Sequence, residues 1–278
     1  KEFSKKVGSK FAVAVNNGTS AIEVPLRALN LNGKDVLLGT NTFIATAIAI
    51  KNAGGNPIPI DIEDEYYSLC PKRLEASITN KTAAVILIHI GGLVTPHTKK
   101  IQELCKLNNI HLIEDCAQAF GSTLDNVHVG NFGKAGCFSF QTTKVMTTGE
   151  GGMVITNDEE YYNDLISARQ YGYDFHNPLL HINSGSNFKM SEFVALLGIC
   201  ELDRVDKRMN KRRLLGERYQ DNLSGKTWET LSPAPGSTSG YYKQIIISPI
   251  SRKIITKKLS DANIALTGGV YFIPIHRQ

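Results

Sequence analysis

One lysine, Lys144, stands within CFSFQTTKVMTTGEGGMVITND, residues 137–158. It follows the apolar run CFSF, which indicates a buried strand, so a freely solvated surface lysine is the less favoured interpretation. An amine kept out of bulk water is more readily neutral, and a neutral amine attacks a carbonyl to give a Schiff base. Gly149, Gly151 and Gly152 fit either a tight turn beside a bound group or a plain hairpin turn. Lys144 is therefore a candidate nucleophile.

A second polar stretch, NNGTSA at 16–21, follows the apolar run FAVAV and opens a segment of helical period. The backbone amides near Gly18, Thr19 and Ser20, together with the two hydroxyls, would hold a phosphate against the positive end of the helix dipole. Thr and Ser are also favoured at helix N-caps, so an ordinary cap explains the stretch equally well.

Two acidic residues, Glu114 and Asp115, end the apolar run IHLIED. A carboxylate at a strand end is often the cap of the next helix, and this alternative stays open. The functional alternative is an anion that holds a cationic heterocycle by a charge-assisted hydrogen bond of about 1.5–3 kcal/mol. Gln118 would face the same side of the following turn.

These three features fit one ligand. Pyridoxal 5'-phosphate (PLP) requires a cradle for its phosphate, a carboxylate for its pyridinium nitrogen and a lysine that forms a Schiff base. The combination is more specific than any of its parts.

The elements that would position these residues follow an alternating pattern. From residue 11 to about 115, helical segments separate the apolar runs FAVAV, DVLL, PIPIDI, AAVILIHI and IHLIED. Runs that are apolar throughout predict strands covered on both faces, and therefore a mostly parallel sheet. We predict an α/β fold with a doubly wound core, in which ligands gather beyond the carboxyl ends of the strands.

The pattern changes after IHLIED. Two strand-like runs, GCFSF and GGMVIT, flank Lys144, and a helical period then extends from Ser191 to about Leu223. We place a domain boundary inside that helix, between a large cofactor-binding domain at 1–205 and a small C-terminal domain at 206–278. The chain ends at YFIPIHRQ, just after a strand-like run, so we expect both terminal ends to be incomplete.

Composition excludes several classes of protein. With 278 residues, 42% of them hydrophobic, the chain can bury a substantial core and is not disordered. Net charge is +5, and interleaved acids in the basic run RVDKRMNKRRLLGER at 204–218 favour a solvated helix face over a nucleic-acid site. Five cysteines without a CxxC pair indicate reduced, mostly buried thiols and no metal site. Without a membrane span or signal-like start, we expect a soluble cytoplasmic protein.

The sequence resembles the DegT/DnrJ/EryC1/StrS aminotransferases, which transfer an amino group to keto sugars attached to nucleotides. The matching motifs, in family order and spacing, are NNGTSA, TNTFIATAIAI, GGNPIPIDI, IEDCAQAFGS, FSFQTTKVMTTGEGGMVITND, RQYGY and SGSNFKMSEFVALLG. The resemblance covers nearly the whole chain. It implies the type I PLP-dependent transferase fold of aspartate aminotransferase, with a mostly parallel central sheet and a smaller C-terminal α+β domain.

The resemblance also implies roles for single residues. Lys144 would carry the cofactor as a Schiff base and later move the proton. Asp115 would pair with the pyridine nitrogen, and Gln118 would lie near the ring hydroxyl. Phe43 would stack on the ring face, although a core position is an open alternative for this aromatic residue.

Phosphate contacts follow from the same resemblance. Thr19, Ser20 and Ser139 would bind the phosphate within one chain. Asn187 would contact the phosphate of a neighbouring protomer, which implies a homodimer with shared active sites. Lys189 departs from the family pattern, because arginine is usual there and lysine lacks its rigid two-pronged donor.

The implied reaction is a two-stage transamination, from an amino acid, by family analogy glutamate, to a nucleotide-linked keto sugar. One branch of the family has histidine in place of the lysine and removes a sugar hydroxyl, so Lys144 favours transamination. TTGEGG resembles enzymes that act at C4 of a 4-keto-6-deoxy sugar more than those that act at C3. A sugar dehydratase of the same fold and a non-catalytic PLP-binding regulatory protein stay open as alternatives. Sugars of lipopolysaccharide, other polysaccharides, protein glycans and antibiotics are all compatible.

Overall fold

A seven-stranded sheet forms the centre of the computed structural model, which describes residues 1–174, 177, 179–223, 225–266 and 273–277. The strand order is β1-β9-β8-β5-β4-β2-β3. The strands of this sheet are β1 (Phe11–Val15), β2 (Asp35–Gly39), β3 (Asn56–Ile60), β4 (Thr82–Ile88), β5 (His111–Asp115), β8 (Ala135–Ser139) and β9 (Gly152–Thr156). All neighbouring strands in the sheet are parallel except for the two pairs that include β9. The predicted α/β fold with a mostly parallel sheet is confirmed.

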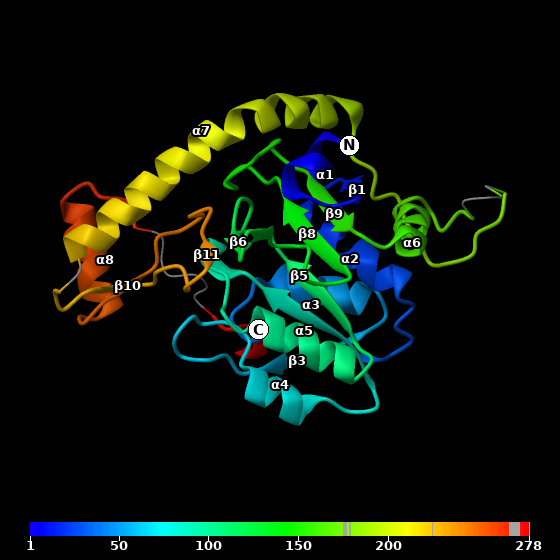
Figure 1. Cartoon of the computed structure of the whole chain (residues 1–278), viewed down its shortest axis with the longest axis horizontal. Coiled ribbons are helices and arrows are strands. Elements are labelled where there is room, and N and C mark those ends of the chain that lie inside the picture. Colours follow the sequence, from blue (N-terminus) through cyan, green and yellow to red (C-terminus); the bar gives the residue numbers. More distant parts are fainter. Residues whose placement is uncertain (175–176, 178, 224, 267–272, 278) are drawn as a thin grey trace.

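Helices cover both faces of the sheet (Figure 1). One layer contains α2 (Gly18–Ala28), α3 (Ile44–Asn52) and α6 (Glu159–Arg169). The opposite layer contains α4 (Pro71–Ser77) and α5 (Thr98–Leu107). The molecule is therefore a three-layer α/β/α arrangement around the strands.

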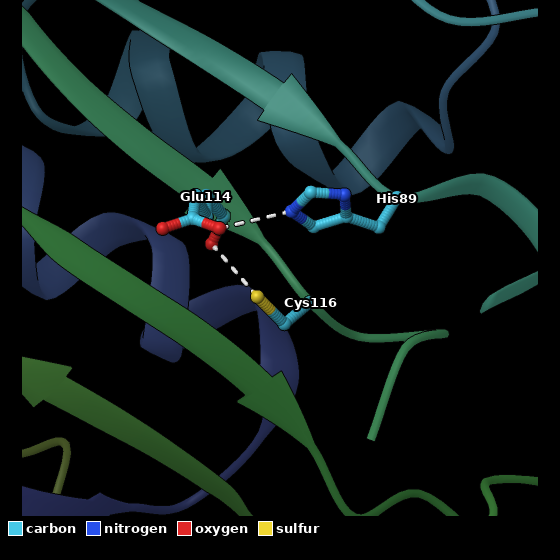
Figure 2. Close-up of side chains that lie close together, drawn as sticks. All are labelled: His89, Glu114 and Cys116. Atoms are coloured by element: carbon cyan, nitrogen blue, oxygen red, sulfur yellow. Dashed lines mark hydrogen bonds and ion pairs between the residues drawn. The ribbon is translucent and has the colours of Figure 1, made fainter. Parts of the chain in front are cut away.

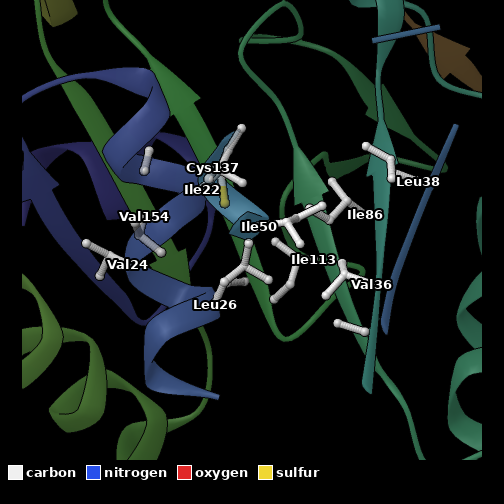
Figure 3. Close-up of a cluster of buried hydrophobic side chains, with 14 of the residues drawn as sticks. Ile22, Val24, Leu26, Val36, Leu38, Ile50, Ile86, Ile113, Cys137 and Val154 are labelled. Atoms are coloured by element: carbon white, nitrogen blue, oxygen red, sulfur yellow. The ribbon is translucent and has the colours of Figure 1, made fainter. Parts of the chain in front are cut away.

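Buried aliphatic side chains fill the space between the sheet and the α2–α3–α6 layer (Figure 3). Successive side chains of a strand point to opposite faces, so Val36 and Leu38 belong to this cluster while Leu37 packs on the α4–α5 side. In β5, Ile113 likewise joins the first cluster and Leu112 the second. Burial of each such side chain contributes about 1.5–3 kcal/mol, which strongly fixes the faces of both strands.

One apolar run differs from the expectation of strands covered on both faces. β3 lies at the end of the sheet, and its Asn56, Ile58 and Pro59 are exposed. Because proline has no N–H to donate to a neighbour, the two prolines of NPIPI fit an edge strand.

The long helix α7 (Glu192–Leu223) links the layered body to the C-terminal part, as the yellow ribbon of Figure 1 shows. It contacts α1 (Glu2–Val7) and β10 (Glu229–Thr230). The remaining short elements are η1 (Ile90–Gly92), β6 (Thr123–Leu124), β7 (Val127–His128), β11 (Ser237–Thr238), β12 (Ile246–Ile247), α8 (Arg252–Asp261) and η2 (Ile275–Arg277). β10 pairs with β12, whereas β11 joins β6 and β7 in a separate sheet.

The predicted domain boundary between residues 205 and 206 lies inside α7 and stays a prediction. The strand-like run before the chain end falls largely on 267–272, outside the described residues. In the part of the chain that the structure describes, the helices are too short or too polar to cross a membrane.

The basic run at 204–218 is only partly a solvated face. Lys207, Lys211 and Arg218 of α7 are exposed, as expected. Arg208 instead donates to the carbonyl of Val145, and two further arginines of α7 also bind loop carbonyls. The positive charge of this helix therefore also ties it to the loops beneath it.

All five cysteines are free thiols, in line with the prediction. Cys105, Cys116 and Cys137 are buried, and Cys200 is exposed. Burial raises the pKa of the Cys105 thiol to about 12, so the reactive thiolate is scarce at neutral pH.

Candidate active site

A cavity of about 520 Å³ lies beyond one edge of the sheet. The strands β1, β2, β5 and β8 run in the same direction, so their carboxyl ends meet at this edge. The predicted site residues that line the cavity are Thr19, Phe43, Asp115, Gln118, Ser139 and Lys144. The fold therefore brings together side chains that are far apart in the sequence.

Lys144 lies in the loop after β8 and is half-buried in the cavity wall. Its backbone N–H donates to the carbonyl of Gln141 over 2.9 Å. Its Nζ lies 4.7 Å from the centroid of the Tyr242 ring. The amine is thus held among protein groups, unlike that of a freely solvated surface lysine.

Asp115 is buried at the end of β5. Its Oδ1 accepts from the Ala117 N–H over 3.1 Å, and its Oδ2 accepts from Thr46 Oγ1 over 3.2 Å. Burial raises the pKa of the Asp115 carboxyl, an effect that the Ala117 amide, Lys144 and Thr46 partly offset. Residues 117 and 118 form a turn, so the helix-cap alternative is wrong although the carboxylate does cap this turn.

Glu114, the residue before Asp115 in β5, contacts a separate set of groups, among them His89 and Cys116 (Figure 2). Its Oε1 accepts from the amides of Phe132 and Gly133, 2.7 Å each. Its Oε2 accepts from the Gly130 amide over 2.8 Å and from His89 Nε2 over 3.0 Å.

His89, Glu114 and Cys116 are residue types that bind metals, and their ligand atoms lie within 4.8 Å of one another. The carboxylate oxygens, however, already face four N–H groups, and Cys116 Sγ lies 3.8 Å from the Glu114 carbonyl oxygen, to which it donates. A cation would have to displace these donors. We assign Glu114 a structural task, which is to hold the loop at 130–133 against β5.

The start of α2 forms the third wall of the cavity. Asn17 is its N-cap, and Asn17 Oδ1 accepts from the Ser20 N–H over 2.8 Å. The stretch does contain a helix cap, but the capping residue is Asn17 and not the threonine or serine on which that alternative was based. Ser20 is buried and does not line the cavity, whereas Gly18 and Thr19 do. The predicted phosphate contact of Ser20 stays a prediction.

Gly18 stands where a side chain would not fit. A Cβ atom there would lie 2.6 Å from Ser139 Cβ and 2.7 Å from Ser139 Oγ. The absence of a side chain lets the start of α2 approach the end of β8 closely. The backbone amides of Gly18 and Thr19 therefore stand at the open end of the helix, beside the Ser139 hydroxyl.

The remaining predicted residues differ in their surroundings. Gln118 Oε1 accepts from the Gly91 amide over 2.7 Å, which fixes the side-chain orientation at the cavity wall. Phe43 is 57% exposed, so its alternative as a core aromatic is wrong. Asn187 is exposed just before α7 and does not line the cavity of its own chain. Lys189 Nζ lies 4.7 Å from the centroid of the Tyr171 ring.

Two lining residues, Tyr242 and Lys243, were not predicted from the sequence. They come from the C-terminal part of the chain, beyond the predicted domain boundary. Neither follows a strand of the large sheet, so the strand-end rule gave no signal for them. The contact of Tyr242 with Lys144 joins segments that are distant in the sequence.

Comparison with known proteins identifies the family. The model of the DegT/DnrJ/EryC1/StrS aminotransferase family matches residues 1–278. The chain belongs to this family. The predicted family resemblance is thereby confirmed.

Two curated relatives show the range of names within the family. A GDP-perosamine synthase of Escherichia coli O157:H7 is 36% identical over 224 residues, 80% of this chain and 61% of that protein. A UDP-N-acetyl-3-dehydro-alpha-D-glucosamine 3-aminotransferase of Acidithiobacillus ferrooxidans is 33% identical over 276 residues, 98% of this chain and 73% of that protein. The chain thus spans about three fifths of the length of the first relative.

Solved structures confirm the fold. DesV of S. venezuelae, in complex with a ketimine intermediate, aligns with a TM-score of 0.91 and 28% identity, covering 100% of this chain and 74% of that one. A GDP-4-keto-6-deoxymannose-3-dehydratase aligns with a TM-score of 0.86 and 23% identity, covering 95% of this chain and 75% of that one, which shows a shared fold alone.

Proposed function

We propose that this chain is a PLP-dependent aminotransferase that moves an amino group from an amino acid to a nucleotide-linked keto sugar. The observation that carries the proposal is that Lys144, Asp115 and the open start of α2 face one cavity. Membership of the aminotransferase family supports the reaction class. The names of the two curated relatives support a nucleotide-linked sugar as substrate.

The cavity residues fit the parts of PLP. The amides of Gly18 and Thr19 with the Ser139 hydroxyl suit a phosphate, because a helix N-terminus attracts anions and no Cβ of Gly18 fills the space. Asp115 suits the pyridine nitrogen, since a cationic ring would favour the ionised form of this buried carboxyl. When bound, PLP supplies an electron sink for the carbon that exchanges its proton.

The side chains of this chain would divide the remaining tasks. The Lys144 amine would hold the cofactor and would carry the proton to and from the reacting carbon. Asp115 would keep the proton on the pyridine nitrogen. Gln118 would lie near the ring hydroxyl, and Phe43 would stack on the ring face and reduce the access of water. Ser20 is buried at the start of α2, and its contact with the phosphate remains part of this proposal.

The active unit in this proposal is a homodimer. The side chains of Phe193, Leu196, Leu197 and Cys200 recur at helical spacing on α7 and are all exposed. Exposed apolar surface of this kind marks association sites. A second copy seated there would bring Asn187, which precedes α7, toward the cavity of its partner.

Glutamate is the amino donor in this proposal, and C4 is the position aminated. The preference for C4 rests on the TTGEGG sequence alone. The name of the Acidithiobacillus ferrooxidans relative assigns that protein to a 3-position, so C3 is the competing outcome. Incubation with glutamate and GDP-, dTDP- or UDP-linked sugars of both the 4-keto and the 3-keto series, followed by nuclear magnetic resonance of the product, distinguishes the two positions.

The two alternative functions have less support. A dehydratase is disfavoured by Lys144, and it would be recognised by ammonia release without an aminated sugar. A non-catalytic PLP-binding regulatory protein would be recognised by cofactor binding without turnover of any keto sugar. Nucleic-acid binding by such a protein is disfavoured because Arg208, Arg212 and Arg213 of α7 are engaged with loop carbonyls.

Attachment of the cofactor provides the first test. We expect the protein supplied with PLP to absorb in the visible range and, after borohydride reduction, to carry the label on the peptide with Lys144. Lys144→Ala should abolish both the label and turnover. Lys243→Ala, which removes the other lysine of the cavity wall, should retain the label. Attachment to another peptide, or no attachment, would refute the proposed role of Lys144.

A further inference from the structure

Tyr242 faces Lys144 across the cavity wall. The Lys144 Nζ atom lies 4.7 Å from the centroid of the Tyr242 ring, and both residues line the cavity. A cation within about 6 Å of an aromatic ring face is attracted to the negative charge of the face. The ring face is therefore placed to hold the ammonium group of Lys144.

A chain of hydrogen bonds fixes the ring. The Tyr242 hydroxyl lies 3.1 Å from Thr143 Oγ1, and Thr143 Oγ1 lies 2.7 Å from Gln141 Oε1. The Gln141 oxygen can only accept, so the Thr143 hydroxyl donates to it. Tyr242 must then donate to Thr143. Thr143, the residue before Lys144, thereby fixes the position of the Tyr242 ring.

The backbone around Tyr242 is held from two sides. Arg212 of α7 donates to the Tyr241 carbonyl over 2.9 Å and to the Tyr242 carbonyl over 3.4 Å. The Lys243 N–H donates to the Gly91 carbonyl over 3.1 Å. These contacts anchor the segment to α7 and to the turn that also holds Gln118. The position of the ring is therefore built into the fold.

We propose that Tyr242 is a positioning residue for Lys144, which holds the lysine ammonium by its ring face and is itself fixed through Thr143. This inference rests on the proposed function, in which the released lysine donates a proton to the reacting carbon. The ammonium is the form that can donate that proton. Tyr242 thus keeps the proton donor at the cavity wall while the lysine is not bonded to the cofactor.

The decisive test uses the cofactor-free protein and needs no substrate. Tyr242 is replaced by phenylalanine and by mono-, di- and trifluorophenylalanine, which have similar shapes but progressively less negative ring faces. Acetic anhydride labels lysines through the neutral amine, and mass spectrometry follows Lys144 relative to Lys253 of α8. We expect labelling of Lys144 to accelerate along the series by about fivefold in total.

Matched controls separate the effect of the ring charge at position 242 from changes in the accessibility of Lys144 to the reagent. The same analogues in place of Tyr219, an exposed tyrosine of α7, should leave the Lys144 rate unchanged. Tyr242→Phe, which keeps the ring and loses the bond to Thr143, should label within about twofold of the wild type. Equal Lys144 rates across the fluorinated series would overturn the proposal.

Turnover gives an independent measurement. In the cofactor-loaded enzyme, we expect Tyr242→Leu to lower kcat about tenfold with little change in KM for the amino donor, and Tyr242→Phe to recover most of the loss. A rise in KM with kcat unchanged would contradict a positioning role. If the wild type turns over no keto sugar, the proposed function fails, and the labelling series still decides the role of Tyr242.

Discussion

Glu114 and Asp115 are neighbours in β5, and their carboxylates lie on opposite faces of the sheet. Asp115 lines the cavity beside Lys144. Glu114 accepts four hydrogen bonds from N–H groups on the other side. The pleat of one strand therefore gives two identical functional groups different tasks.

Glu114→Gln should destabilise the fold. A glutamine amide has one accepting oxygen, so its NH2 group would face N–H donors that now bind a carboxylate oxygen. We expect a loss of about 2–4 kcal/mol in the free energy of unfolding, measured by urea denaturation of the cofactor-free protein. Glu103→Gln on α5, where the side chain is exposed and pairs with Lys100, should change stability by less than about 0.5 kcal/mol. Equal effects of the two substitutions would refute an anchoring role for Glu114.

Asp115→Asn should stabilise the cofactor-free protein while impairing activity. Burial raises the pKa of this carboxyl in the folded chain, so the folded state binds the proton more tightly than the unfolded state does. Stability is therefore lost as pH rises through the folded pKa, and asparagine removes that loss. At pH values above the pKa of Asp115 in the folded protein, we expect the substitution to raise the free energy of unfolding by about 0.5–2 kcal/mol. Below about pH 4, we expect no increase from this source.

Thermal unfolding of the cofactor-free wild type and of Asp115→Asn across pH 4 to 8 measures this difference. Asparagine can still accept from the Ala117 amide and donate to Thr46 Oγ1, so the local hydrogen bonds are retained. With cofactor bound, we expect kcat to fall by about 10²-fold or more, because the pyridine nitrogen loses its anionic partner. If the mutant is less stable than the wild type at pH 7, ionisation of Asp115 does not destabilise the folded protein.

Gly18→Ala should weaken cofactor binding. The added Cβ would lie 2.6 Å from Ser139 Cβ, so the start of α2 and the end of β8 must separate. Overpacking of this kind costs about 1–3 kcal/mol, which would correspond to a loss of affinity of about 5- to 150-fold if it falls on the binding site. Titration with PLP, followed by absorbance, measures the loss. Gly198→Ala is the matched control, because a Cβ there would lie 3.4 Å from Thr148 Cγ2, an ordinary contact, and alanine favours a helix.

Much of the fold could be predicted because a buried strand has a continuous run of apolar residues, which can be recognised in the sequence. FAVAV, DVLL and IHLIED became β1, β2 and β5, and the parallel order of the sheet then assembled their carboxyl ends at one edge. The position of β3 as the outermost strand of the sheet could also have been foreseen from its prolines. The opposite faces of Glu114 and Asp115 follow from the two-residue period of a strand, a signal that the sequence contains.

Other features depend on contacts between distant segments and leave no local pattern. The approach of Tyr242 to Lys144 is set by α7, whose arginines bind loop carbonyls. A carbonyl acceptor is present at every residue, so no sequence motif identifies these partners. The close packing of Gly18 on Ser139 is likewise a property of the assembled sheet.

If the proposed homodimer forms through the start of α7, a charge introduced there should disrupt the dimer, whereas a charge near the other end of the helix should not. Leu196 is 62% exposed in the proposed interface, near the start of the helix, and Leu214 is 67% exposed nearer its end. Leu196→Glu should convert the dimer to a monomer, since a charge buried in an apolar contact is costly. Leu214→Glu has the same chemistry and similar exposure, and we expect it to remain a dimer. Sedimentation velocity reports the mass of each variant. If Asn187 acts across this interface, Leu196→Glu should also bind PLP more weakly than Leu214→Glu, whereas a wild-type monomer would exclude the shared site.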